Sequence, residues 1–252
     1  MTKEEFINEV TTDLATPPQY FPKNVLMNQS LNDDIDSIIK KGLNPIHVEE
    51  FEKLNADSSI ITIDCRTQKD FSVEHVPNSI FIGLNGSFAP WVGTLINDLN
   101  QTIILICDNG KEQEAVTRLA RIGYDNSVGY LDGGMPAWIH AGKNTESVKS
   151  IDPQQLEKTF NEINNIIDVR KTGEYDSEHI KGVPNLPLDS IYSSFDSYDP
   201  EQTYHLHCKS GYRSMITASI LKANGFQNIV DISGGFDLIK VTTNLELQTQ
   251  EC

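Results

Sequence analysis

The sequence predicts an α/β protein of two similar domains, each a parallel sheet flanked by helices on both faces. Three observations lead to this fold class: a chain of 252 residues, an internal repeat, and short β-branched runs that alternate with helical patterns. The length is about twice that of a common 100–150-residue domain. Strands that are apolar on both sides are typical of parallel sheets buried between helices.

Two long segments of the chain repeat each other. IDCRTQKDFSVEH at 63–75 reappears as IDVRKTGEYDSEH at 167–179, a shift of 104, and Cys107 matches Cys208 at a shift of 101. The Gly-Gly pair at 133–134 matches the pair at 234–235, again at 101. Similarity at nearly constant spacing indicates a duplicated domain. We therefore divide the chain into a linker segment (1–42), a first domain (43–145), a second domain (149–245) and a tail (246–252).

The elements follow in the same order in both copies. Strands are predicted at 60–64, 102–107 and 127–131 in the first copy and at 165–169, 203–208 and 228–232 in the second. Asp152 and Pro153 should cap and open a helix, because a side-chain acceptor followed by proline favours a helix start. Gly225 should end the helix that begins near Met215. Before the repeat, we expect a charged helix near 2–10 and a polar helix around 31–41.

Charge and composition exclude several classes of function. A net charge of −16 repels polyanions, so we expect no nucleic-acid partner. No apolar run approaches the roughly 20 residues that span a bilayer, and the first residues do not resemble a signal peptide. The four cysteines have no paired spacing, so neither a disulfide framework nor a zinc site is indicated. We expect a cytoplasmic protein with free thiols, no membrane contact, no metal and no cofactor.

The segment CKSGYRS, between a predicted strand and a predicted helix, points to nucleophilic chemistry. Backbone amides of such a loop converge, and the helix N-terminus adds a positive dipole end, so the loop can hold an anion. Lys209 and Arg213 favour a thiolate at Cys208, and Gly211 permits the tight backbone path. The segment carries +2 within a strongly acidic chain, which predicts an anionic substrate.

Both copies resemble the rhodanese (thiosulfate sulfurtransferase) family. CKSGYRS is similar to the family's CxxGxR loop, HIKGVPNLPL after Asp168 to its second signature, and LDGGMPAW at 131–138 to its Gly-Gly element. The resemblance implies that Cys208 accepts a sulfane sulfur as a persulfide and passes it on. We assign catalytic roles to Cys208 and Arg213, and substrate binding to the rest of the loop: Lys209, Ser210, Gly211, Tyr212 and Ser214.

The predicted function is a sulfurtransferase that moves sulfane sulfur from thiosulfate or a persulfide to a thiol, sulfite or cyanide, in sulfide detoxification. A sulfur-carrier module that delivers its persulfide to a protein partner is the alternative from another class. A phosphatase or arsenate reductase is a further alternative, although such enzymes resemble Cys-x5-Arg, and here four residues separate Cys208 from Arg213.

The first copy departs from the family pattern at its cysteine loop. It reads CDNGKEQ, with Glu112 in the place of Arg213 and Asp108 in the place of Lys209, and the loop charge falls to −1. We interpret this domain as a degenerate rhodanese domain with a structural or docking role. A second sulfur relay at Cys107 remains the alternative.

Other chemically capable residues are given scaffold roles. His75 and His179 recur in both copies, and Asp64 with Arg66, like Asp168 with Arg170, should form ion pairs. His205 and His207 lie on one face of a strand, and packing is the favoured role over a metal site.

The segment EEFINEVTTDLATPPQYFPKNVLMN at 4–28 resembles the tail of a metallo-β-lactamase-fold persulfide dioxygenase in bacterial fusions with rhodanese domains. This resemblance implies such a domain as a partner.

Overall fold

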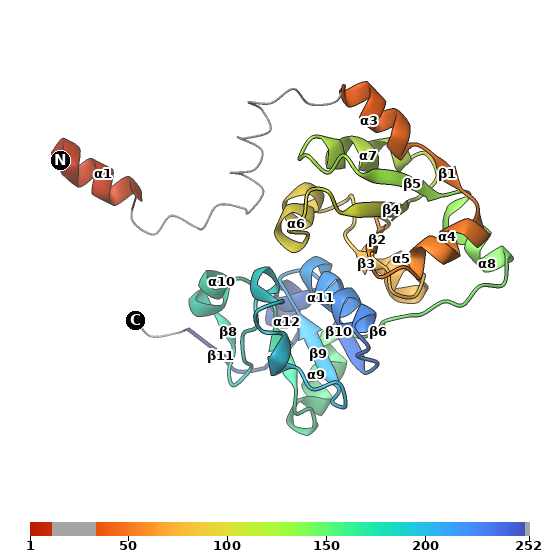
Figure 1. Ribbon diagram of the computed structural model, residues 1–252. Coiled ribbons are helices and arrows are strands. Elements are labelled where there is room, and N and C mark those ends of the chain that lie inside the picture. Colours follow the sequence, from red (N-terminus) through yellow and green to blue (C-terminus); the bar gives the residue numbers. More distant parts are fainter. Residues whose placement is uncertain (12–33, 250–252) are drawn as a thin grey trace.

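The computed structural model describes residues 1–11 and 34–249, which form two α/β domains preceded by a helix, α1 (Lys3–Thr11) (Figure 1). Most of the segment 4–28 therefore lies outside the described residues, as does Cys252. Within the described parts of the chain, no helix is both long and apolar enough to cross a bilayer.

The first domain is built on a five-stranded sheet in the order β1-β5-β4-β2-β3, and all its strand pairs are parallel. The strands are β1 (Pro45–Ile46), β2 (Ile60–Asp64), β3 (Ile80–Phe81), β4 (Thr102–Ile106) and β5 (Ser127–Leu131). The helices are α3 (Ile35–Gly42), α4 (Val48–Asn55), α5 (Gln68–Val73), α6 (Phe88–Leu95), α7 (Glu112–Ala120) and α8 (Gly134–His140). Along β4, Ile103 and Leu105 pack in one apolar cluster, and Ile104 and Ile106 pack in another. The sheet is thus buried on both faces, as a parallel sheet requires.

The second domain has a four-stranded parallel sheet in the order β6-β10-β9-β7. These strands are β6 (Lys149–Ile151), β7 (Ile166–Asp168), β9 (Tyr204–His207) and β10 (Ile229–Ile232). The helices are α9 (Pro153–Thr159), α10 (Thr172–Ser177), α11 (Tyr212–Ala223) and α12 (Gly235–Thr242), with 3-10 turns η1 (Phe160–Glu162), η2 (Leu188–Ser190) and η3 (Phe195–Ser197). The predicted fold class is confirmed in both domains.

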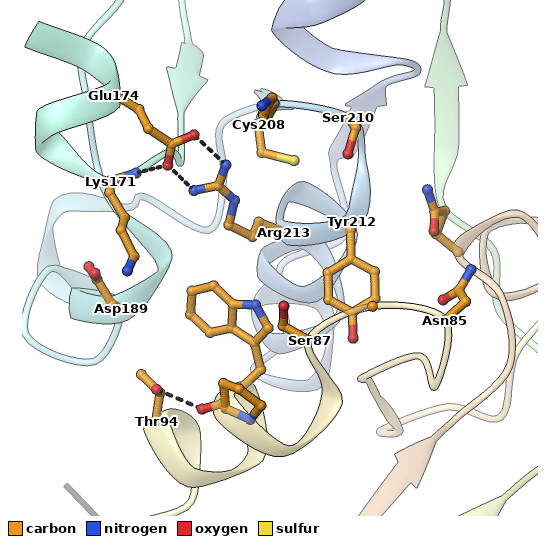
Figure 2. Close-up of a pocket in the computed structure, with 15 residues that line it drawn as sticks. Asn85, Ser87, Thr94, Lys171, Glu174, Asp189, Cys208, Ser210, Tyr212 and Arg213 are labelled. Atoms are coloured by element: carbon orange, nitrogen blue, oxygen red, sulfur yellow. Dashed lines mark hydrogen bonds and ion pairs between the residues drawn. The ribbon is translucent and has the colours of Figure 1, made fainter. Parts of the chain in front are cut away.

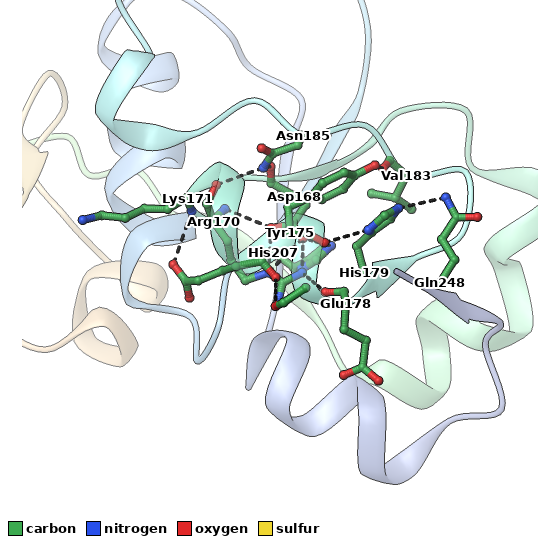
Figure 3. Close-up of polar contacts among 12 residues, drawn as sticks. Asp168, Arg170, Lys171, Tyr175, Glu178, His179, Val183, Asn185, His207 and Gln248 are labelled. Carbon is green, nitrogen blue, oxygen red and sulfur yellow. Dashed lines mark hydrogen bonds and ion pairs between the residues drawn. The ribbon is translucent and has the colours of Figure 1, made fainter. Parts of the chain in front are cut away.

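The two ends of the repeat are extended by neighbouring segments. Helix α3, from the linker segment, packs on α7 and β5 of the first domain. Strand β11 (Leu247–Gln248), from the tail, pairs antiparallel with β8 (His179–Ile180) of the second domain. The Gln248 side chain also contacts the His179 ring, with 2.9 Å between Nε2 atoms (Figure 3).

Local sequence signals explain several element ends. Asp152 accepts a hydrogen bond from the Gln155 N–H at 2.7 Å, and Pro153 occupies the first turn of α9. Gly225 has a φ of 91° just after α11, the left-handed conformation that glycine adopts most readily. Both predicted helix boundaries are confirmed.

The same ion pair stabilises the end of the corresponding strand in each domain. Arg66 lies 2.7 Å from Asp64, and Arg170 lies 2.6 Å from Asp168, with all four side chains buried. Arg170 also donates to the Glu178 carbonyl at 2.8 Å, as Figure 3 shows. These pairs are confirmed scaffold contacts, because they tie a strand end to the following loop in both copies.

The equivalent histidines also make equivalent contacts. His75 Nδ1 lies 2.8 Å from the Phe71 carbonyl, and His179 Nδ1 lies 2.7 Å from the Tyr175 carbonyl. Each imidazole stacks on the aromatic ring of that same residue. Burial lowers the pKa of His75 to about 4, so this ring is neutral at physiological pH.

The two domains meet along α11, which packs against β3 of the first domain. The Phe81 N–H donates to Ser219 Oγ at 2.9 Å, and Lys222 forms an ion pair at 3.1 Å with Glu146, in the short segment that joins the domains. One apolar cluster includes buried residues of both domains. The helix that follows Cys208 is therefore also the main interdomain element.

Candidate active site

Cys208 lies immediately after β9, at the carboxyl end of the second sheet. Its side chain is 1% exposed, and the Gly211 N–H donates to its Sγ at 3.2 Å. Gly211 has a φ of 98° and precedes α11, so the left-handed turn folds the chain back over the sulfur. An N–H aimed at sulfur stabilises negative charge on that atom.

The helix after Cys208 begins earlier than expected. We expected it near Met215, but α11 starts at Tyr212, directly after Gly211. The reason is that the left-handed glycine completes the turn in fewer residues than the sequence suggested. Tyr212, Arg213 and Ser214 therefore have fixed helical backbone positions instead of lying in a loop.

The second Gly-Gly pair supports the loop from behind. A Cβ on Gly235 would lie 2.4 Å from the Cys208 carbonyl oxygen, closer than atoms can approach. Beyond this glycine, the Phe236 N–H donates to that carbonyl at 2.7 Å, and the Asp237 N–H donates to the Lys209 carbonyl at 3.0 Å. The N-terminus of α12 thus holds the backbone of the cysteine loop. The signal for this support in the sequence is the repeated Gly-Gly pair.

Arg213 is engaged with a carboxylate that the sequence analysis did not identify. Its two terminal nitrogens lie 2.5 and 2.8 Å from the oxygens of Glu174, on α10 (Figure 2). The hydrogen bond from Arg213 is the main cause that lowers the pKa of Glu174. One of the two positive charges counted for the loop is therefore balanced by Glu174. Such a bidentate pair fixes the guanidinium plane.

Tyr212 extends from the cysteine loop into the first domain. Its hydroxyl donates to the Gly83 carbonyl at 2.6 Å, and its ring contacts Phe81 edge-on at 5.4 Å between centroids. A Cβ on Gly86 would lie 2.4 Å from the tyrosine ring. The first domain therefore helps to fix the position of the cysteine loop.

Ser214 lies below the loop and is fully buried. Its hydroxyl donates to Asp231 Oδ1, on β10, at 2.6 Å. Burial raises the pKa of Asp231 to about 7, and the hydrogen bond from Ser214 offsets part of that rise.

A cavity of about 1040 Å³ opens in front of Cys208, between the two domains (Figure 2). From the cysteine loop and α11 it is lined by Cys208, Lys209, Ser210, Tyr212 and Arg213. Lys171, Glu174 and Asp189 complete the side of the second domain, and Gln68, Asn85, Gly86, Ser87, Pro90, Trp91 and Thr94 form the side of the first. Of the seven predicted site residues, five line this cavity. Gly211 and Ser214 are not among the lining residues.

The loop of the first copy has a different environment. Cys107 follows β4 and is 4% exposed, and it is not among the residues that line this cavity. Lys111 and Arg118 both pair with Glu114, at 2.9 and 2.5 Å. No arginine stands where Arg213 stands in the second copy, because Glu112 opens α7.

The strand before Cys208 carries two buried or half-buried histidines. Burial lowers the pKa of both His205 and His207, which favours neutral rings. Within residues 1–11 and 34–249, no group of three or more His, Cys, Asp or Glu side chains is placed to hold a metal ion.

Comparison with known proteins identifies the family. The sequence model for the rhodanese-like domain matches residues 47–141 and 152–241, which together make up more than half of the chain. The chain belongs to the rhodanese-like domain family. Both copies are thus rhodanese domains, including the one with the altered loop.

Individual rhodanese relatives each match a part of the chain. The YrkF protein of Bacillus subtilis (strain 168), named as a candidate sulfur carrier, is 29% identical over 98 residues, which cover 38% of this chain and 53% of YrkF. The thiosulfate sulfurtransferase GlpE of Pseudomonas entomophila (strain L48) is 30% identical over 94 residues, which cover 37% of this chain and 86% of GlpE. A Staphylococcus aureus rhodanese-like domain structure is 28% identical, with a TM-score of 0.37, and the match covers 40% of this chain and all of that one.

The chain spans about half the length of the first curated relatives, at 53% and 56%. The rhodanese domains and these relatives indicate a sulfurtransferase or sulfur-carrier role at the level of the family.

Proposed function

We propose that the protein is a sulfurtransferase in which Cys208 carries the sulfur as a persulfide. The observation that carries this proposal is the position of Cys208: its sulfur accepts an N–H at the end of β9, beside an interdomain cavity lined by Lys171, Lys209 and Arg213. Cationic groups around a nucleophilic sulfur favour an anionic donor.

The proposed reaction has two displacements at sulfur. The Cys208 thiolate attacks the outer sulfur of thiosulfate or of a low-molecular-weight persulfide, the S–S bond of the donor breaks, and sulfite or a thiolate leaves with the electron pair. An acceptor thiolate, sulfite or cyanide then attacks the outer sulfur of the Cys208 persulfide, and the Cys208 thiolate is regenerated. The Gly211 N–H stabilises charge on the Cys208 sulfur in both steps.

Arg213 is proposed to hold the anionic donor at the wall of the cavity. Its bidentate contact with Glu174 fixes the guanidinium at the wall of the cavity, where it can face a bound anion with its remaining N–H groups. Lys209, Ser210 and Tyr212 line the same wall and are proposed to contact the substrate. Gly211 contributes its backbone N–H, and Ser214 supports the loop from below.

The size of the cavity favours an organic thiol as the acceptor. At about 1040 Å³ it is far larger than sulfite or cyanide, and it is in the size range of pockets that hold drug-sized ligands. Its wall contains carboxylates as well as cations, since Glu174 and Asp189 line it with Lys171 and Lys209. This mixture suits a thiol that carries both amino and carboxylate groups. Turnover of such thiols would place the protein in sulfide detoxification.

The sulfur-carrier alternative is favoured by one relative, YrkF, whose name describes a candidate sulfur carrier. Under this hypothesis the outer sulfur of the Cys208 persulfide passes to a protein partner. We propose a metallo-β-lactamase-fold persulfide dioxygenase domain as that partner. Multiple turnovers with thiosulfate and a small thiol would support the enzyme, whereas a single loading without turnover would support the carrier.

Intact-mass measurement of the full chain tests the proposal. Thiosulfate should add one sulfur, about 32 Da, to Cys208, and cyanide or a thiol should remove it. Cys208→Ser should abolish the adduct, and the matched variant Cys107→Ser should retain it. An adduct on Cys107 alone, or no adduct at all, would contradict the assignment.

A further inference from the structure

The first domain contains two cysteines at the ends of neighbouring strands. The paired ladder of β2 and β4 ends with Asp64 opposite Ile106, and Cys65 and Cys107 are the next residues on the two strands. The Cys65 N–H donates to the Ile106 carbonyl at 2.8 Å, which holds the two chain segments together at that point. The two cysteines are therefore in-register neighbours.

Both side chains lie on the same face of the sheet. Ile63 and Leu105, two residues before each cysteine, share one apolar cluster with Cys65 and Cys107. Ile106, between Leu105 and Cys107, belongs to the cluster on the opposite face. Since side chains alternate along a strand, the two thiols point in the same direction.

The spacing of paired strands suits a disulfide. Neighbouring strands lie about 4.8 Å apart, inside the range of about 4.4–6.8 Å between Cα atoms that disulfides accept. Both thiols are free in the structure, and the Cys65 thiol donates to the Ile63 carbonyl, with 3.8 Å between sulfur and oxygen. The in-register strand ends therefore place the two thiols as neighbours on one face of the sheet.

The two thiols differ in their environment. Burial, followed by the proximity of Cys107, raises the pKa of the Cys65 thiol well above its ordinary value. Cys107 adjoins an exposed loop, 108–110, and occupies the position that Cys208 has in the second copy. Both cysteines are buried, at 3% and 4% exposed, so we assign the first attack to Cys107 because it adjoins this exposed loop, and Cys65 is the second thiol.

The second copy cannot form the same pair. At the shift of 104 that relates the two segments, Val169 stands where Cys65 stands. The catalytic copy therefore has one thiol, which can hold a persulfide, whereas the degenerate copy has two adjacent thiols.

We infer that Cys65 and Cys107 form a dithiol site that reduces sulfane sulfur to sulfide and closes to a disulfide. The Cys107 thiolate attacks the outer sulfur of a low-molecular-weight persulfide, and the donor leaves as its thiol. Cys65 then attacks Cys107 Sγ, the bond to the outer sulfur breaks, and hydrogen sulfide leaves with the Cys65 proton. Overall, one persulfide and two protein thiols give one thiol, one hydrogen sulfide and one intramolecular disulfide.

This site would let the first domain reduce sulfane sulfur to sulfide instead of transferring it to an acceptor. A persulfide on Cys107 is removed by its neighbour before an acceptor can take it, so the first domain passes no sulfane sulfur onward. The disulfide returns to two thiols when a small thiol reduces it. The inference does not depend on the role proposed for Cys208.

The test uses the full chain with Cys208→Ser and Cys252→Ser, in which Cys65 and Cys107 are the remaining thiols. The probe is glutathione persulfide. We expect one equivalent of sulfide per chain, a mass lower by two hydrogens, and a peptide cross-link between Cys65 and Cys107 that dithiothreitol removes.

The matched control adds Cys65→Val, which introduces the residue of the second copy at this position. This variant should release no sulfide and should retain one sulfur, about 32 Da, on Cys107. Circular dichroism and a thermal melt verify that both proteins are folded. A stable persulfide on Cys107 in the presence of Cys65, equal sulfide release from the control, or no reaction with either protein would overturn the inference.

Discussion

Replacing Asp231 with asparagine should change how the stability of the protein depends on pH. Asp231 is a buried carboxyl on β10 that accepts a hydrogen bond from Ser214, in the first turn of the helix after Cys208. Burial raises its pKa from an ordinary value of 3.8 to about 7 in the folded protein. Asparagine has nearly the same shape and can accept the same hydrogen bond, but it does not titrate.

The direction of the effect follows from proton linkage. Between pH 4 and 7 the folded protein keeps the Asp231 proton while the unfolded chain has lost it, so the free energy of unfolding falls as the pH rises. The difference between 3.8 and about 7 corresponds to about 4 kcal/mol, an upper limit that is reached above the folded pKa. The unpaired amide of asparagine lowers the free energy of unfolding of the variant by an amount that does not depend on pH. Between pH 4 and 7 the free energy of unfolding of the variant should therefore rise relative to that of the original protein. Above pH 7 the difference between the two free energies should stay constant.

Urea unfolding of both proteins at several pH values between 4 and 8.5 measures this difference. Two domains can unfold in separate transitions, so the readout is the transition that reports the second domain. A difference that stays constant across this range would mean that Asp231 titrates normally. A difference that moves in the opposite direction would mean that the folded protein stabilises the ionised carboxylate.

Two further predictions concern the contacts of the cysteine loop. Tyr212→Phe removes the hydrogen bond to the Gly83 carbonyl and should lower the free energy of unfolding by about 1 kcal/mol. It should also lower kcat/KM for thiosulfate, whereas Tyr192→Phe, at an exposed side chain, should change neither quantity. Arg213→Ala should lower kcat/KM for thiosulfate roughly 10²-fold, because it removes a charge-assisted donor and leaves the Glu174 carboxylate beside the anion site. Adding Glu174→Gln should restore part of that loss, and a double variant no better than the single one would show that Glu174 does not repel the donor.

The strands, the helix caps and the strand-end ion pairs could be predicted from the sequence because they depend on neighbouring residues. Strand β2 occupies the predicted residues 60–64, and the capping residues Asp152 and Pro153 act within one helical turn. The repeat predicted the two-domain organisation, since two copies of the same pattern form two similar domains.

The partner of Arg213 could not be predicted, although it lies within the repeat. Glu174 is 39 residues away along the chain, and its equivalent in the first copy is Asp70. Asp70 accepts a hydrogen bond from Thr67 at the start of its own helix. The carboxylate at this position therefore binds the start of its own helix in one copy and an arginine in the other. Which contact it makes depends on the side chains that the folded domain brings close to it.

By itself, the sequence determined the duplicated α/β fold, and it predicted Cys208 as the nucleophile and the first copy as degenerate from its altered loop. The tertiary structure decided which residues surround Cys208. The cavity wall that contains Trp91 comes from the first domain, and Cys65 meets Cys107 only because β2 and β4 pair in register. Local patterns specify strands and turns through short-range sterics and hydrogen bonds, whereas the packing of one domain on another depends on the shapes of whole faces, which no short segment encodes.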